Sequence, residues 1–177
     1  MDALILRDKK LEINDIPEPE LNDGEAKVKV LYAGLCGSDM HRIDHYDGDQ
    51  PLVLGHEFVG EVVDINCDNI RDSVNAKIGD IVAVSPTLPC NECENCAEGN
   101  DNLCNSFHGI GRDRPGAFAE KVNVPISNLV CIPENSIYRN YVLADVVAVC
   151  LHAIEDMAGN VQGKKCLIIG DGAIGSV

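Results

Sequence analysis

The sequence lacks basic side chains relative to acidic ones. Its 177 residues carry 14 Lys and Arg against 29 Asp and Glu, which gives a formal net charge of −15. Proteins bind nucleic acids largely through cations that neutralise the phosphates, and anionic membrane surfaces attract basic segments for the same reason. The charge therefore argues against a nucleic-acid partner and a membrane surface, and it is consistent with good solubility.

The sequence also lacks an apolar run that could span a bilayer. The longest such run, YVLADVVAVCLHAI, is too short and carries Asp145. The first residues, MDALILRDKK, include an acid at Asp2 and too few apolar positions for a secretory leader. No internal repeat stands out. We therefore expect a cytoplasmic protein whose cysteines stay reduced.

Short β-rich runs separated by turn residues fill the first three quarters of the chain. Alternating apolar residues or β-branched clusters bounded by glycine and proline are typical of strands. Several short strands of this kind indicate a mainly β barrel or sandwich, which we place at residues 1–135. The runs are Ala26–Gly34, His56–Ile65, Asp80–Ser85, Gly116–Val124 and Leu129–Pro133.

The pattern changes after Pro133. A helix-length segment follows, with Ser136 as the expected N-cap and Gly159 as the stop, so we predict a linker helix over 136–160. The next segment, CLII, is predicted to be a buried strand, and GDGAIG follows it directly.

The glycines of GDGAIG fit G-x-G-x-x-G directly after a strand. Gly170, Gly172 and Gly175 are therefore candidate cofactor-binding residues, because such glycines let the backbone approach a dinucleotide pyrophosphate at a helix N-terminus. The sequence ends at Val177, before the rest of such a unit. We expect residues 161–177 to be the start of a truncated nucleotide-binding domain.

Four cysteines stand in a polar loop, at Cys90, Cys93, Cys96 and Cys104. Disulfides are disfavoured in a reducing compartment and between cysteines so close in sequence. A redox pair favours a single C-x-x-C at a strand–helix junction. Four thiolates suit tetrahedral Zn²⁺, with an iron–sulfur cluster as the alternative. We predict a structural zinc site that stabilises the loop.

A second, mixed set of metal donors lies outside that loop. Cys36 and His56 come from separate strand ends, and Glu57 follows the histidine as a ligand or a nearby base. Catalytic zinc sites use three protein ligands and leave a fourth position for water or substrate. The alternatives are a small buried cysteine and a histidine that is simply hydrogen-bonded.

Five motifs occur in a family-specific order: CGSD, GHEFVGEV, the four-cysteine loop, GAFAEKV and GKKCLIIGDGAIG. The chain resembles the zinc-dependent medium-chain alcohol dehydrogenases, in particular the polyol branch with sorbitol- and galactitol-phosphate-type enzymes; threonine-dehydrogenase-like members also fit. The resemblance implies a GroES-like, partly open β-barrel with a zinc-binding lobe at about 86–106. It implies Cys36 and His56 as catalytic zinc ligands and the four-cysteine loop as the structural site.

The resemblance also implies roles for four further residues. Glu57 matches the family's acid beside the metal, and Asp145 falls where the third ligand lies, although polyol enzymes usually carry Glu there. Ser38 begins the proton path, which continues to His41. In the alternative readings Ser38 caps a turn, His41 is an ordinary exposed histidine and Asp145 is a helical acid.

The remaining cysteines are expected to pack in the core, with Cys150 also a substitute ligand beside Asp145. They are Cys67, Cys131, Cys150 and Cys166.

The function implied by the resemblance is hydride transfer between a small alcohol, either a polyol or a secondary alcohol, and NAD or NADP. Zinc favours loss of the alcohol proton, and the cofactor accepts the hydride. We expect this chain to be inactive alone, because most of the cofactor domain is missing. A non-enzymatic zinc-binding GroES-like module and a degenerate fragment are the alternatives, and a homo-oligomer is compatible with each.

Overall fold

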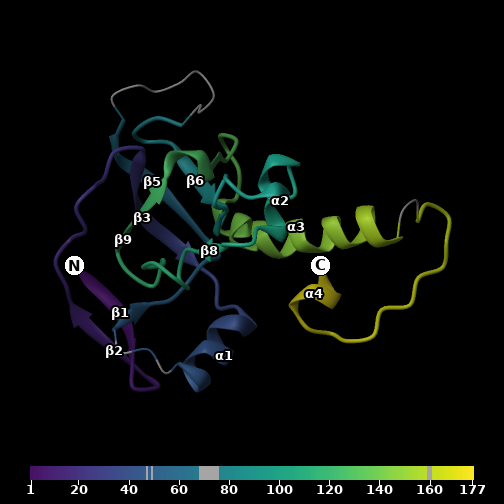
Figure 1. The fold of residues 1–177 in the computed structure, drawn as a ribbon, viewed down its shortest axis with the longest axis horizontal. Helices are drawn as coiled ribbons and strands as arrows, with labels where there is room; N and C mark the ends of the chain where they lie inside the picture. The colour runs from purple at the N-terminus through teal and green to yellow at the C-terminus, as the bar shows by residue number, and fades with distance from the viewer. Residues whose placement is uncertain (47, 49, 68–75, 159–160) are drawn as a thin grey trace.

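The computed structural model describes residues 1–46, 48, 50–67, 76–158 and 161–177, and this part of the chain is mainly β, as predicted (Figure 1). Neighbouring strands are antiparallel in every sheet of the described residues. The largest sheet has the order β10-β6-β5-β3-β9, with β3 (Glu25–Ala33), β5 (Phe58–Asn66), β6 (Ile81–Val84), β9 (Lys121–Pro125) and β10 (Leu129–Cys131). A second has the order β2-β1-β4, with β1 (Asp2–Arg7), β2 (Lys10–Asp15) and β4 (Leu52–Val53). The strands β7 (Thr87–Leu88) and β8 (His108–Gly109) form a short pair.

The main core lies against the central strands β3 and β5. Alternate residues of a strand face the same side of the sheet, so Val28 on β3 and Val62 on β5 are both fully buried. Phe58, the first residue of β5, is 2% exposed and is among the largest buried side chains. Register shifts between Lys27 and Val28 and again near Tyr32 bend this pair. The predicted strands at 26–34 and 56–65 correspond to β3 and β5.

The β1–β2 hairpin at the N-terminus was not predicted from the sequence. Its turn residues Asp8 and Lys9 both have positive φ, 49° and 61°. Two-residue hairpin turns of this kind usually carry Asn-Gly or Asp-Gly, and this chain has neither signal there. The turn is held instead by six paired positions, from Asp2 opposite Asp15 to Arg7 opposite Lys10.

The helical region after Pro133 begins later than predicted. Ser136 caps no helix; its hydroxyl contacts the Tyr141 hydroxyl at 3.3 Å. Residues Tyr138–Leu143 form a 3₁₀ helix (η3), α3 covers Ala144–His152, and a π-helical turn covers Ala153–Ala158. The predicted stop at Gly159 lies outside the described residues. Within the described ranges, no helix has the length and hydropathy needed to cross a membrane.

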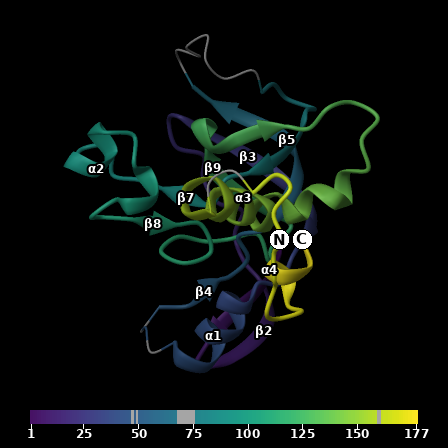
Figure 2. The same ribbon diagram turned by 90° about the vertical axis from the view of Figure 1, so that its right-hand side faces the viewer.

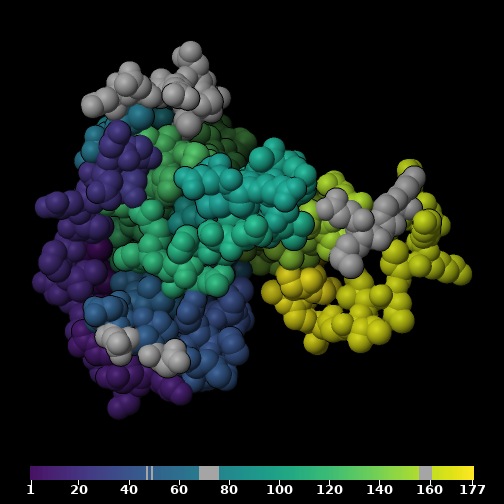
Figure 3. All heavy atoms as spheres, in the orientation of Figure 1, coloured from purple at the N-terminus to yellow at the C-terminus, as the bar shows by residue number. Residues whose placement is uncertain are grey.

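The predicted strand at CLII does not form a sheet with any described residue. Leu167 is 85% and Ile169 91% exposed, because a strand needs a neighbour for its backbone hydrogen bonds and its apolar side chains. Figure 3 shows this segment looping away from the β-domain. The four-residue helix α4 (Ala173–Ser176) ends the chain and packs near α3.

The lobe that carries the four cysteines projects from the side of the β-domain (Figure 2). It contains α2 (Glu94–Ala97) and a 3₁₀ turn at Asp101–Leu103. Asn102 in this turn lies 3.5 Å from the His152 ring on α3, so the lobe also contacts the helical region.

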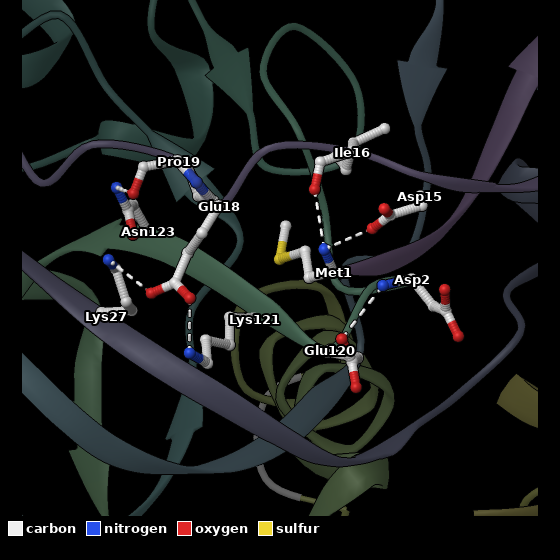
Figure 4. A network of polar contacts seen from close by, with 10 residues as sticks. All are labelled: Met1, Asp2, Asp15, Ile16, Glu18, Pro19, Lys27, Glu120, Lys121 and Asn123. Carbon is white, nitrogen blue, oxygen red and sulfur yellow. Dashed lines mark hydrogen bonds and ion pairs between the residues drawn. The ribbon is translucent and has the colours of Figure 1, made fainter.

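Ion pairs attach the N-terminal segment to the large sheet (Figure 4). Glu18 accepts hydrogen bonds from Lys27 on β3 and Lys121 on β9, and these bonds lower the pKa of Glu18 to about 2. The N-terminal ammonium of Met1 donates to Asp15 at 2.8 Å. The segment between β2 and β3 is thereby held across the sheet.

A more buried ion pair joins Glu25 on β3 to Arg114. Burial would raise the pKa of the Glu25 carboxyl, but hydrogen bonds from Arg114 and Asn22 outweigh it, so the pKa lies below its usual value. A group with a depressed pKa in the folded state stabilises the protein above its unfolded pKa, and this stabilisation is lost as the pH falls through the folded pKa.

We therefore expect Glu25→Gln to lower the free energy of unfolding by about 1.5–3 kcal/mol at pH 7, the range for a hydrogen bond to a charged group. The difference from wild type should shrink as the pH falls below the unfolded carboxyl pKa, about 4.3. Urea unfolding of both proteins, from pH 7 to below the unfolded carboxyl pKa, measures this difference in the free energy of unfolding. The other acids titrate alike in both proteins, so a difference independent of pH would contradict the assignment.

Candidate functional site

The register of β3 and β5 brings the two halves of the mixed donor set together. The strands are antiparallel, and Ala33 at the end of β3 pairs with Phe58 at the start of β5. Cys36 follows β3 and His56 and Glu57 precede β5, so residues some twenty positions apart meet at one edge of the sheet.

The helix α1 (Gly37–His45) fixes the position of Cys36. Cys36 is its N-cap, and the third helical residue, Asp39, accepts a hydrogen bond from the Cys36 backbone N–H at 3.0 Å. This reciprocal arrangement is a capping box, which satisfies backbone donors that a helix start leaves free. Asp39 also accepts from the Gly55 N–H at 3.4 Å, so its buried carboxylate connects both segments of the site.

His56 lies between two partners. Its Nδ1 is 3.4 Å from Asp39 Oδ1, and its Nε2 is 3.4 Å from Ser38 Oγ. The hydrogen bond to Asp39 outweighs burial and raises the pKa of His56 to about 9. Because Nδ1 faces the carboxylate, Nε2 is the nitrogen left for a metal, and Asp39 would orient the ring as metal-bound histidines require.

One ligand atom each from Cys36, His56 and Glu57 lie within 4.8 Å of one another. Glu57 is 6% exposed, and within the described part of the chain its carboxylate has neither a hydrogen bond nor an ion pair. A Cβ on Gly34 would lie 2.7 Å from Glu57 Oε2, so glycine leaves room for this side chain. A carboxylate on a largely buried residue with no positive partner would be stabilised by a cation, which the sulfur, nitrogen and oxygen donors of this cluster could bind together. The donor set fits Zn²⁺.

Asp145 lies nearby but outside that group. It sits in the first turn of α3, and burial raises its pKa while the charge of His56 partly offsets this. Asp145 does not belong to the group of ligand atoms that lie within 4.8 Å of one another. Its role as the third ligand therefore stays a prediction.

The four cysteines of the lobe form a compact cluster. Cys93 Sγ is 3.5 Å and Cys90 Sγ is 3.9 Å from Cys96 Sγ, and Cys104 Sγ accepts from the Cys90 N–H at 3.2 Å. A tetrahedron with Zn–S bonds of about 2.3 Å has sulfur–sulfur edges of about 3.8 Å. Disulfide sulfurs would be about 2.05 Å apart, and all four cysteines are free thiols. The spacing fits four thiolates around one zinc ion.

The electrostatics of the loop also favour a cation. Backbone N–H groups of Asn105 and Cys96 lower the pKa of Cys93 to about 6, so one thiolate forms readily. Burial and the neighbouring Cys93 then raise the pKa of Cys96 to about 12. Four thiolates can coexist at neutral pH when a divalent ion neutralises their mutual repulsion.

The structure places the other predicted site residues less directly. His41 lies on α1 and stacks on His45 with ring centroids 4.2 Å apart; within the described residues no hydrogen bond links its side chain to Ser38. Gly170 has a φ of 118°, and a Cβ on Gly175 would lie 2.2 Å from the Gly170 carbonyl oxygen, so these glycines make a tight turn into α4.

The expectation for the remaining cysteines was partly wrong. Cys131 and Cys166 are exposed, because Cys131 lies on the edge strand β10 and Cys166 in the unpaired segment. Cys67 packs against the main core. Cys150 donates to the Ile174 carbonyl at 3.5 Å and lies outside both donor clusters.

Asp39 is the site residue that the sequence analysis missed, although its place three residues after Cys36 in CGSD is a capping-box signal. We expect Asp39→Asn to weaken zinc binding at the mixed site by about 10–100-fold, since the amide cannot hold the His56 ring as a carboxylate does. Competition with a zinc chelator measures this. Asp44→Asn, an exposed acid on the same helix, is the control. Equal zinc retention in both variants would argue against an orienting role.

A β-domain that joins a Cys/His/Glu cluster to a separate four-cysteine loop defines a class of zinc-dependent oxidoreductases. The model for the alcohol dehydrogenase GroES-like domain matches residues 22–134. The chain belongs to this family, the zinc-dependent medium-chain alcohol and polyol dehydrogenases, and the fold and family predicted from the sequence are confirmed.

Three relatives illustrate the similarity. L-threonine 3-dehydrogenase of Streptomyces avermitilis is 41% identical over 93% of this chain and 48% of its own. The crystal structure of galactitol-1-phosphate dehydrogenase from Escherichia coli has a TM-score of 0.89 at 32% identity, covering 99% of this chain and 50% of that one. A zinc-binding dehydrogenase from Sinorhizobium meliloti, solved with NADP, has a TM-score of 0.79 at 31% identity, covering 87% and 44%. The chain thus spans about half the length of the curated relatives it matches.

Proposed function

We propose that this chain forms the zinc-binding catalytic part of a dehydrogenase that transfers a hydride between an alcohol, either a polyol or a secondary alcohol, and NAD or NADP. The observation that carries the proposal is the cluster of Cys36, His56 and Glu57, whose ligand atoms lie within 4.8 Å of one another. The relatives act on threonine and galactitol 1-phosphate by name, which supports a small hydroxylated substrate. Residues 1–135 would form this part, and residues from 161 onward would begin a nucleotide-binding domain.

In this proposal Cys36 and His56 hold the catalytic zinc, with Glu57 or Asp145 completing the protein ligands. The bound zinc would act as a Lewis acid that favours loss of the alcohol proton. Asp39 keeps the Nδ1 proton of His56 in place and so presents Nε2 to the site. The four-cysteine loop holds a second, structural zinc.

Ser38 is the residue placed to receive the substrate proton. Its hydroxyl lies 3.4 Å from His56 Nε2, beside the metal position, and it lines a cavity of about 510 Å³. His41, one helical turn further along α1, lines the same cavity and can accept the proton that Ser38 releases. The cavity provides room for a small alcohol.

The test measures metal binding and hydride transfer separately. Purified chain should hold two zinc ions by elemental analysis, and Cys36→Ser should hold one. Cobalt in place of zinc absorbs visible light, so an alcohol that enters the site should change the spectrum of the wild type and not that of Cys36→Ser. NAD(P)H formation from sorbitol or threonine then reports turnover.

Each outcome has a clear meaning. Two zinc ions with a spectral response to alcohols support the proposed site. Two zinc ions without any such response favour a non-enzymatic zinc-binding module. One zinc ion in the wild-type chain and the same content in Cys36→Ser would show that the mixed cluster does not bind metal and would falsify the proposal.

A further inference from the structure

The cavity beside His56 has walls from two distant parts of the chain. One wall is α1, which contributes Ser38, His41 and Arg42. The other is the segment around β8, which contributes Phe107 and Arg112. The proposed function uses the end of this cavity at Ser38 and His56 and assigns nothing to the arginines.

The charge of this cavity is opposite to that of the protein. The whole chain carries −15, yet the charged side chains that line the cavity within the described part of the chain are two arginines and one acid, Asp39. Asp39 is 2% exposed and already engaged by His56 and two backbone N–H groups. The cavity therefore presents cations that its own acid does not neutralise.

Arg42 is the first of these cations. It is half-buried on α1, and among the described residues its guanidinium makes neither an ion pair nor a hydrogen bond. A guanidinium offers five donors in a planar fork and stays charged at every physiological pH. An arginine in this position has its donors available to a ligand in the cavity.

Arg112 is the second cation, and it is held in place by an aromatic ring. Its guanidinium carbon lies 5.4 Å from the centroid of Phe107, which also lines the cavity. Its Nε is 3.6 Å from Asp113, but that carboxylate also accepts the Gly109 N–H at 2.9 Å. The ion pair is long and half-exposed, so the terminal amino groups of Arg112 remain free to bind a ligand.

Two imidazole rings also line the α1 wall of the cavity. His45 Nδ1 lies 2.9 Å from the His41 carbonyl oxygen, and a carbonyl can only accept, so Nδ1 carries the proton. The stacked pair of His41 and His45 lines the cavity next to Arg42. The wall thus combines a fixed charge with polar ring atoms.

We propose that Arg42 and Arg112 bind an oxyanion on the substrate, so that the preferred substrate is an alcohol that also carries a phosphate monoester or a carboxylate. This inference rests on the proposed function, since it places the hydroxyl group at the metal and the anionic group between the arginines. Two guanidiniums match the double charge of a phosphate monoester, and their forked donors match the oxygens of either group.

Binding of three probes to the zinc-loaded chain tests the proposal by calorimetry, without any cofactor. Sorbitol 6-phosphate carries a phosphate, L-threonine carries a carboxylate, and sorbitol carries neither. We expect at least one anionic probe to bind at least about tenfold more tightly than sorbitol. Arg42→Gln and Arg112→Gln should each weaken binding of that anionic probe about tenfold. Arg42→Lys should weaken it less.

Arg7→Gln and Arg139→Gln are the matched controls, since each removes one positive charge from an exposed arginine outside the cavity. Both should leave the anion preference unchanged. Zinc content and thermal unfolding confirm that every variant is folded. If the arginines increase the affinity for sorbitol 6-phosphate, the anionic group of the substrate is a phosphate. If they increase the affinity for threonine, it is a carboxylate.

Equal binding of sorbitol and both anionic probes would overturn the inference, as would an anion preference that survives both arginine substitutions, because the oxyanion would then bind the metal or the general surface. The proposed function is judged independently by the cobalt spectrum with sorbitol. A spectral response to sorbitol without an anion preference rejects this inference alone. Absence of a spectral response to sorbitol and to both anionic probes rejects the proposed function.

Discussion

Replacing Cys96 with serine should release one of the two zinc ions that we propose and unfold the lobe between Pro89 and Cys104. The lobe contains no buried side chain in its helical turns, so packing contributes little to its stability. Structural zinc supplies on the order of 10–16 kcal/mol in small zinc-stabilised units, and a serine hydroxyl is a poor substitute for a thiolate. Elemental analysis and protease cleavage within the lobe measure the two effects.

The control for this prediction is Cys131→Ser. Cys131 is exposed and lies outside both donor clusters, so its loss should leave two zinc ions and an uncut lobe. Because the lobe contacts α3 through Asn102 and His152, its unfolding should also increase hydrogen exchange in that helix. Full zinc content in Cys96→Ser would exclude the four-cysteine site.

Phe58→Ala is expected to lower the free energy of unfolding by about 3–5 kcal/mol, the usual cost of removing a large buried aromatic side chain. Phe58 is 2% exposed and belongs to the main core cluster. A domain of this size has roughly 5–15 kcal/mol of stability in total, so the variant should be close to unfolding at room temperature. Urea unfolding of the zinc-loaded protein measures the change.

The same substitution should also loosen the mixed metal site, because Phe58 directly follows Glu57 and pairs with Ala33 at the end of β3. Zinc should therefore dissociate from that site before it leaves the lobe. Ile13→Ala is the matched control, since Ile13 is 75% exposed and its truncation should change stability by less than about 0.5 kcal/mol. Similar effects of the two substitutions would show that the core does not depend on Phe58.

The sequence allowed the central strands and the four-cysteine cluster to be predicted because these signals are local. Strand alternation identifies β3 and β5, and the spacing of four cysteines within one loop restricts their chemistry. The pairing of Cys36 with His56 needed the family resemblance, since the register of β3 against β5 that joins them is a long-range property.

Long-range packing explains what the sequence analysis missed. The segment after Ser136 has the composition of a helix, but Tyr138, Tyr141 and Val142 pack against a buried cluster of the β-domain, and this packing holds it in 3₁₀ turns before α3 begins. The charge of the cavity likewise depends on Arg42 and Arg112, which are far apart in sequence and meet through the fold. Neither arrangement has a local signature.

The bridge that Glu18 makes to β9 has a consequence for how the chain acquires its shape during synthesis. Glu18 and Lys121 are 103 positions apart. A ribosome takes on the order of 10 s to cover that distance, so the segment that carries Glu18 cannot be held across the large sheet until β9 emerges. All four thiols of the lobe emerge within one short stretch and can capture a metal ion in that interval. The metal-binding lobe can therefore fold before β9 and β10 emerge and complete the large sheet.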